Sequence, residues 1–131
     1  IQNKPVIATG KGDVFEETNV SLEKYYVVLA MPPVQVSTAE AYQGVEPGAG
    51  NFNLSGLKDL PIEEWRSVLI NDFESSIFKN HPLIQKVKDE FYQAGALYAS
   101  MSGSGASVYG IFKNELKLAQ LERDNLVYYG I

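Results

Sequence analysis

The alternation of apolar and polar stretches along the chain predicts a small set of strands. Residues 25–31 form an almost unbroken apolar run, which is typical of a strand buried on both faces, and Pro32 and Pro33 end it. Shorter apolar runs predict strands over 97–100, 108–112 and 127–131, and a separate pair over 5–9 and 13–16 around Gly10-Lys11-Gly12.

Apolar residues at helical spacing predict the helices between these strands. Leu83, Ile84, Val87 and Phe91 form one stripe over 82–94, where Asn80 precedes the helix as its cap and Gly95 ends it. Further helices are expected over 38–43 behind the N-cap Ser37, over 61–67 from Pro61, over 71–79, and over 115–122 behind Asn114. Residues 45–60, rich in glycine and asparagine, are expected to form a loop.

From residue 25 onward the predicted order is strand, helices, strand, strand, helix, strand. This is the split β-α-β-β-α-β order of ferredoxin-like folds, in which helices cover one face of an antiparallel sheet. The sequence therefore predicts a single α+β domain over residues 1–131, with extra helices in the first crossover.

Composition narrows the range of functions. The 131 residues carry a formal net charge of −5, which argues against non-specific binding to nucleic acid or to an anionic membrane. The longest apolar run is too short to span a bilayer. The chain has no cysteine, so disulfides, thiolate metal sites and cysteine nucleophiles are excluded.

The most informative stretch joins the predicted strands 97–100 and 108–112. Gly103, Ser104 and Gly105 leave the backbone bare there, and a nest of free N–H groups can hold phosphate oxygens without a cationic side chain. A Gly-Ser-Gly turn also serves simply to connect two strands, so the local pattern leaves both interpretations open.

Other candidate groups are few. His81, the only histidine, stands at a helix start, where a structural role is favoured over that of a base. Tyr42 is either a core aromatic or a stacking platform for a planar ring, and Trp65 is expected to pack. Asp72 is a conceivable general base without an evident partner, and the sequence contains no metal-ligand cluster, nucleophile elbow or Walker motif.

Four phrases in order carry a family resemblance: Ala-Thr-Gly-Lys-Gly-Asp (8–13), Val-Ser-Thr-Ala-Glu-Ala-Tyr (36–42), Asn-Asp-Phe-Glu (71–74) and Ala-Ser-Met-Ser-Gly-Ser-Gly (99–105). Together they resemble the C-terminal domain of the 4-diphosphocytidyl-2-C-methyl-D-erythritol kinases, which belong to the GHMP kinase superfamily. The resemblance covers essentially the whole chain and implies a cytoplasmic enzyme of non-mevalonate isoprenoid biosynthesis. It implies ATP and Mg²⁺ as cofactors and a cytidine diphosphate derivative as the small-molecule substrate.

The resemblance also implies that this chain is only the substrate side of such an enzyme. Family members carry the catalytic lysine and aspartate and the ATP phosphate loop in an N-terminal ATP-binding domain. That domain is absent here, and residues 1–5 look like the segment that follows the catalytic aspartate. We therefore expect no catalytic residue and no metal ligand in this chain, no kinase activity of the chain alone, and its own N-terminal domain as its partner.

Site residues carry over only where the motifs match. Gly103, Ser104 and Gly105 match the loop beside the transferring phosphoryl group, and valine at either glycine is expected to cost turnover more than stability. Tyr42 matches a ring placed against cytosine, and Thr38 and Ala39 match residues that line the substrate groove.

Two further motif matches do not imply a direct contact with the substrate. Gln43 stands where some relatives have a lysine, so a cationic contact there is in doubt. Asn71 and Asp72 are expected mainly to buttress the cleft.

Two alternatives remain open at this point. The chain could belong to another GHMP kinase, of the mevalonate or homoserine type, in which case Tyr42 would not stack on a base. It could instead be a non-catalytic ferredoxin-like module that binds a small ligand, in which case the isolated chain would bind a metabolite tightly.

Overall fold

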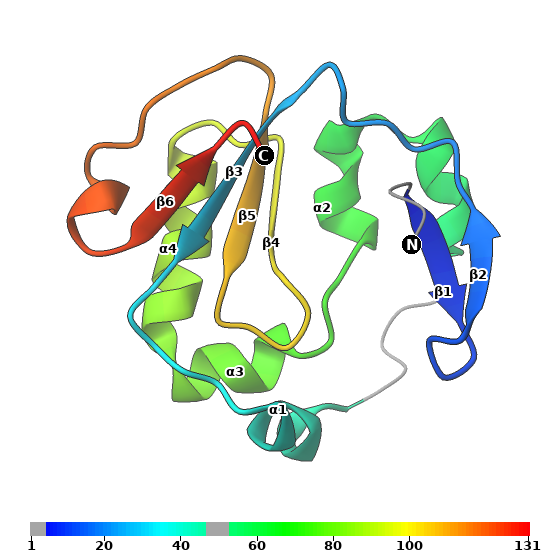
Figure 1. Cartoon of the computed structure of the whole chain (residues 1–131), viewed down its shortest axis with the longest axis horizontal. Coiled ribbons are helices and arrows are strands. Elements are labelled where there is room, and N and C mark those ends of the chain that lie inside the picture. The colour runs from blue at the N-terminus through cyan, green and yellow to red at the C-terminus, as the bar shows by residue number, and fades with distance from the viewer. Residues whose placement is uncertain (1–4, 47–52) are drawn as a thin grey trace.

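The computed structural model describes residues 5–46 and 53–131. At its centre is a four-stranded antiparallel sheet in the order β4-β5-β3-β6 (Figure 1). The strands are β3 (Tyr26–Met31), β4 (Tyr98–Met101), β5 (Val108–Phe112) and β6 (Leu126–Tyr129). This strand order is the one that the split β-α-β-β-α-β pattern requires, so the predicted fold class is confirmed.

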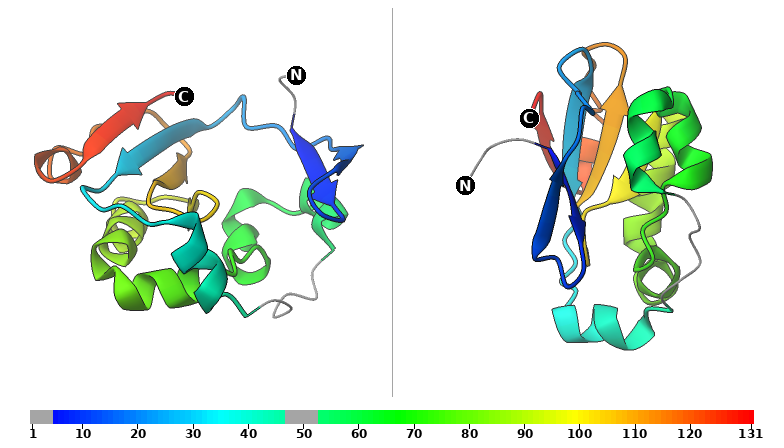
Figure 2. Two further views of the ribbon diagram at one scale, coloured as in Figure 1. Left: turned by 60° about the horizontal axis from the view of Figure 1, so that its bottom comes forward. Right: turned by 90° about the vertical axis from the view of Figure 1, so that its right-hand side faces the viewer.

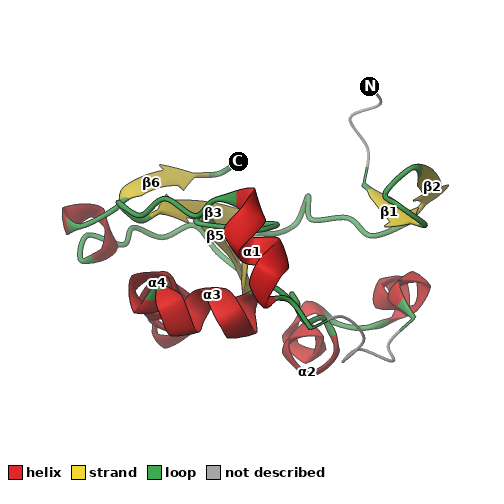
Figure 3. Cartoon of the chain, turned by 90° about the horizontal axis from the view of Figure 1, so that it is seen from below, coloured by secondary structure: helices red, strands yellow, loops and turns green. Residues whose placement is uncertain are grey.

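The main helices lie on one side of this sheet. They are α2 (Trp65–Val68), α3 (Glu74–Asn80) and α4 (Pro82–Gln93), with α1 (Thr38–Gly44) beyond one end of the strands. Figure 3 shows the sheet as one layer and α2, α3 and α4 as a second layer below it. No helix in the described part of the chain is long and apolar enough to cross a membrane.

The core between sheet and helices follows from strand alternation. Val28 and Ala30 of β3 are fully buried, while their neighbours Val27 and Leu29 point to the other face and are half-buried. Phe91 of α4 meets Phe112 of β5 edge to face, with ring centroids 5.9 Å apart. These contacts fix α4 across the sheet.

A second apolar cluster closes the β4 edge. Trp65 is 6% exposed, packs edge-on against Tyr98 at 5.8 Å, and donates its Nε1–H to the Leu60 carbonyl at 3.3 Å. Burial raises the pKa of Tyr98, so the phenol stays neutral and donates to the Leu69 carbonyl at 3.0 Å. The predicted packing role of Trp65 is confirmed.

The two N-terminal strands form a separate hairpin. β1 (Val6–Thr9) and β2 (Val14–Glu17) pair antiparallel, and in Figure 1 they lie beyond α2, on the opposite side of the molecule from β6. Gly10 and Gly12 take positive φ values of 67° and 80° in the connecting turn. The Phe15 side chain is 65% exposed, so this hairpin contributes little to the core.

One predicted helix is wrong. The segment 115–122 contains no α-helix: a 3-10 turn begins at Leu121, and Leu116 and Leu118 pack against the core from a stretch without regular secondary structure. Residues two apart do not share one face of a helix, which argues against a helix that buries both leucines. The Leu118 N–H donates to the Tyr129 hydroxyl at 2.9 Å, which ties the segment to β6.

Other helix boundaries shift. Asn80 ends α3 and does not cap α4, whose N-cap is His81. The helix expected over 61–67 consists of a 3-10 turn (Ile62–Glu64) followed by α2, and α3 begins at Glu74 rather than at residue 71. The loop expected over 45–60 contains a 3-10 helix at Leu54–Asp59. Part of that loop, residues 47–52, lies outside the described residues, as do residues 1–4 of the predicted N-terminal match.

Candidate functional site

Helix α1 presents the residues predicted for the substrate side. Ser37 caps it as predicted, because its hydroxyl accepts the Glu40 N–H at 3.1 Å. Ala41 is fully buried and anchors the helix, while Thr38, Ala39 and Tyr42 are exposed. The structure therefore brings these three residues together on the accessible side of one short helix.

Tyr42 is not a core aromatic, because its side chain is 64% exposed. Phe73 contacts it in a T-shaped arrangement, with ring centroids 5.1 Å apart and an interplanar angle of 77°. A contact of this kind restrains the ring while leaving much of its surface accessible. The geometry fits the stacking-platform interpretation of the sequence.

A polar contact ties α1 to the junction of α3 and α4. His81 Nε2 lies 2.8 Å from Glu40 Oε1, and the Asn80 side-chain amide donates to the same oxygen at 3.4 Å. His81 thus holds α1 in place from the start of α4, in agreement with the structural role expected of it.

The glycine loop, residues 102–107, connects β4 and β5. The Ser102 N–H donates to the Ser107 carbonyl at 2.8 Å and the Gly105 N–H to the Ser102 carbonyl at 3.0 Å, which closes the turn. Among the described residues, the N–H groups of Gly103 and Ser104 find no acceptor. The loop is thus both a strand connection and a source of free backbone donors.

The two glycines of this loop face different surroundings. A Cβ on Gly103, where φ is +56°, would meet no atom within 4 Å. A Cβ on Gly105, where φ is +95°, would lie 2.9 Å from Met101 Sδ and 3.7 Å from Val36 Cγ2. Gly103 therefore borders open space, whereas valine at Gly105 would disturb packing. We therefore expect valine at Gly105 to cost stability as well as turnover.

The glycine loop and α1 lie at the same end of the sheet. Val36 stands two residues before Thr38, and its Cγ2 lies 3.7 Å from the Cβ position of Gly105. The loop and α1 lie at the lower end of Figure 1, and the left view of Figure 2 shows them next to each other. The structure thus brings the two predicted groups of site residues into one region.

Two residues hold the loop, and the sequence predicted a role for only one of them, Asn71. The Asn71 amide donates to the carbonyls of Met101 and Gly103, both at 2.9 Å, which confirms its expected role as a buttress. Glu74, only 9% exposed, accepts the Met101 N–H at 2.8 Å and forms an ion pair with Lys88 at 2.5 Å. The sequence signals for Glu74 are its place in the Asn-Asp-Phe-Glu motif and its spacing of three from Ile77, on the same helical face.

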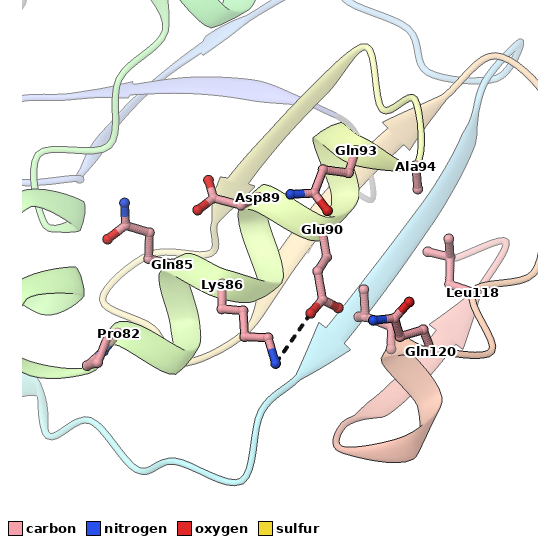
Figure 4. A pocket seen from close by; sticks show the side chains of 10 residues that line it. Pro82, Gln85, Lys86, Asp89, Glu90, Gln93, Ala94, Leu118 and Gln120 are labelled. Atoms are coloured by element: carbon pink, nitrogen blue, oxygen red, sulfur yellow. Dashed lines mark ion pairs between the residues drawn. The ribbon is translucent and has the colours of Figure 1, made fainter.

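A surface hollow elsewhere does not involve these residues. It measures about 660 Å³ and lies between α4 and the segment before β6, as Figure 4 shows. Lys86 and Glu90 form an ion pair across its wall at 3.7 Å. Its lining consists of Pro82, Gln85, Lys86, Asp89, Glu90, Gln93, Ala94, Leu118, Gln120 and Leu121. None of the predicted site residues is among them.

Known structures share this architecture. A crystal structure of 4-(cytidine 5'-diphospho)-2C-methyl-D-erythritol kinase superposes with a TM-score of 0.72 and 18% identity, covering 95% of this chain and 48% of that one. Homoserine kinase from Cytophaga hutchinsonii superposes with a TM-score of 0.64 and 18% identity, covering 96% of this chain and 47% of that one. At these identities the likeness establishes the fold.

Relatives found by sequence are much more similar to this chain than these solved structures are. The 4-diphosphocytidyl-2-C-methyl-D-erythritol kinase of Parabacteroides distasonis is 50% identical over 113 residues, covering 86% of this chain and 42% of the relative. The kinase of the same name from Bacteroides fragilis is 41% identical over 122 residues, covering 93% of this chain and 44% of the relative. The chain thus spans less than half the length of these relatives, and the resemblance stated from the sequence motifs is confirmed.

The family model for the C-terminal part of GHMP kinases matches residues 57–125, which is more than half of the chain. This range includes α2, α3 and α4 and the glycine loop with its two anchoring residues. The fold, the motifs and the family model agree, and the chain belongs to the GHMP kinase family as its C-terminal domain.

Proposed function

We propose that this chain is the substrate-side domain of an ATP-dependent kinase that phosphorylates a hydroxyl group of 4-diphosphocytidyl-2-C-methyl-D-erythritol. The catalytic lysine and aspartate and the ATP phosphate loop then belong to an N-terminal domain of the same protein, which is its partner. The names and identities of the relatives support this substrate, and the enzyme would act in the cytoplasm in isoprenoid biosynthesis.

The observation that carries the proposal is the pairing of free loop donors with an exposed aromatic ring at one end of the sheet. Phosphoryl transfer requires positioned donors that stabilise charge on the transferring group, rather than covalent chemistry from the protein. The N–H groups of Gly103 and Ser104 are available for that purpose, and the conformation that exposes them depends on Gly105.

On the substrate side, the accessible ring of Tyr42 is suited to stack on the cytosine base. The Thr38 hydroxyl, one turn earlier on α1, can donate to a diphosphate oxygen, and the small side chain of Ala39 leaves room for the ligand. The exposed Tyr42 ring can stack on the planar cytosine base, whereas mevalonate and homoserine are aliphatic and offer no such partner. Tyr42 therefore favours the cytidine substrate over these two alcohols.

ATP supplies the phosphoryl group in this proposal, and Mg²⁺ neutralises charge on its phosphates when bound. Within residues 5–46 and 53–131, no three histidine or acidic side chains converge in a way that could hold a metal ion. We propose that the groups that bind Mg²⁺ belong to the N-terminal domain, together with the ATP phosphate loop.

The test is ADP formation by the full-length protein with 4-diphosphocytidyl-2-C-methyl-D-erythritol, mevalonate or homoserine as the acceptor. We expect turnover with the cytidine substrate and at most background rates with mevalonate and homoserine. Turnover with mevalonate or homoserine alone would show a different GHMP kinase. Tight binding of a metabolite without any turnover would favour the non-catalytic module.

A further inference from the structure

The segment Asn-Asp-Phe-Glu at residues 71–74 lies between the glycine loop and α1. Asn71 and Glu74 bond to the chain at the end of β4, and Phe73 contacts Tyr42 of α1. Four consecutive residues therefore touch both parts of the proposed site, which are otherwise far apart along the chain.

At the loop, Asn71 determines which way one peptide group faces. Its Nδ2 donates to the Gly103 carbonyl at 2.9 Å. In a trans peptide the carbonyl and the following N–H point in opposite directions. Holding the Gly103 carbonyl against Asn71 therefore aims the Ser104 N–H away from Asn71, and this N–H is one of the free donors of the loop.

The start of the loop is fixed by a second group. The Glu74 carboxylate accepts both the Met101 N–H at 2.8 Å and the Ser100 hydroxyl at 3.1 Å. Lys88 balances its charge from α4. Because this carboxylate is almost completely buried, its hydrogen bonds are little weakened by solvent and hold the end of β4 in place.

At the other end of the segment, the Phe73 ring restrains Tyr42. The backbone of Phe73 is itself fixed, because its N–H donates to Asn71 Oδ1 at 3.1 Å. One amide side chain thus bonds with its nitrogen to the loop and with its oxygen to the residue that supports Tyr42.

We infer that Asn71 and Phe73 are the positioning residues of this site, Asn71 for the phosphate-facing donors of the loop and Phe73 for the ring that meets the substrate base. Each acts through a neighbouring group, Asn71 through the Gly103 carbonyl and Phe73 through the Tyr42 ring. The kinetic part of this inference rests on the proposed function, whereas its structural part, the hold of Asn71 on the loop, does not.

The first test is Asn71→Asp in the full-length protein. Aspartate has the same shape and keeps an oxygen for the Phe73 N–H, but it replaces the donor to two carbonyls with a repelling oxygen. We expect kcat to fall about 100-fold, the usual effect of displaced catalytic donors, with the KM of the cytidine substrate nearly unchanged.

The second test is Phe73→Leu, which removes the aromatic contact with Tyr42 while keeping an apolar side chain. We expect the KM of the cytidine substrate to rise about three- to tenfold, with little change in kcat. A general loss of structure would not lower only kcat in the Asn71 variant and raise only KM in the Phe73 variant.

Asn125→Asp provides the matched control. The Asn125 side-chain amide also donates to a backbone carbonyl, that of Leu121 at 2.8 Å, but it lies beside the 3-10 turn before β6, away from the site. The same chemical change there should lower the melting temperature and leave kcat and KM unaltered.

Hydrogen exchange of the loop amides separates the two levels of the inference. Asn71→Asp should increase the exchange of the Ser102 and Gly105 amides at least about tenfold, and Asn125→Asp should not, whether or not the protein is a kinase. If Asn71→Asp fails to fold, Asn71→Ser, which keeps a donor, should give a smaller change of the same kind.

Two results would overturn the inference. One is unchanged exchange in the loop of a folded Asn71 variant. The other is an equal fall of kcat and rise of KM in both the Asn71 and the Phe73 variants. If the unaltered full-length protein phosphorylates none of the three alcohols, the proposed function fails, and the exchange measurement still decides whether Asn71 holds the loop.

Discussion

The chain contains two glycine-rich turns that look alike in sequence and differ in structure. The turn at Gly10–Gly12 connects β1 and β2, and its bonds are local: the Gly12 N–H donates to the Thr9 carbonyl at 3.1 Å and the Lys11 N–H to the Asp13 carboxylate at 3.0 Å. The glycine loop between β4 and β5 is held instead by side chains from a distant part of the chain.

The difference shows what separates a connecting turn from a candidate site. Both turns use glycines at positive φ, so backbone conformation alone does not distinguish them. Only the glycine loop is braced from outside by Asn71 and Glu74 and lies next to α1. Bracing of this kind preorganises backbone donors, which is what stabilisation of a developing charge requires.

The largest effect is expected from Gly105→Val. A Cβ there would approach Met101 Sδ to 2.9 Å at a φ of +95°. Strain and overpacking together should destabilise the protein by about 3 kcal/mol, which thermal melting of the full-length protein would measure. Gly95 has the same φ but no atom within 4 Å of its Cβ position, so Gly95→Val isolates the backbone strain. Equal losses in both variants would contradict the packing argument.

The next effect concerns α1. Tyr42→Ala should raise the KM of the cytidine substrate about tenfold or more, because base stacking contributes roughly 1–3 kcal/mol. The melting temperature should change little, since the side chain is 64% exposed. Tyr42→Phe keeps the ring and should keep the KM. An unaltered KM in Tyr42→Ala would remove the cytosine assignment while leaving the family untouched.

The smallest structural change is Gly103→Ala. Its Cβ would enter open space at a φ of +56°, so the stability cost is about 1 kcal/mol of backbone strain. The added methyl group would stand at the free donors, and kcat should fall at least about tenfold. Gly12→Ala, at a φ of +80° and also in open space, provides the matched change in the other turn.

What could be predicted from the sequence depended on local pattern. The apolar run ending at Pro32 gave β3 and the capped stripe gave α4, because neighbouring residues determine both. The helix predicted over 115–122 is wrong because Leu116 and Leu118 pack against the core from a segment without regular secondary structure, and such tertiary packing is not visible in the local pattern.

The parts of the site that depend on distant contacts were harder to predict. Tyr42 and the glycine loop were found from motifs, but the hydrogen bonds from Asn71 to Met101 and Gly103 span 30 and 32 residues. The bond between Glu74 and Met101 spans 27 residues. No local pattern encodes such partners, and an acidic residue in the first turn of a helix is ordinarily interpreted as favourable to the helix dipole.

The role of the glycine loop in phosphoryl transfer is tested most directly by comparing kcat of the full-length Gly103→Ala and Gly12→Ala proteins at saturating ATP and cytidine substrate. The two changes add the same methyl group to similar turns, of which only one is braced by Asn71 and Glu74. We predict a fall in kcat of at least about tenfold for Gly103→Ala and almost none for Gly12→Ala. Equal kcat values in the two variants would contradict the assignment of the glycine loop to phosphoryl transfer.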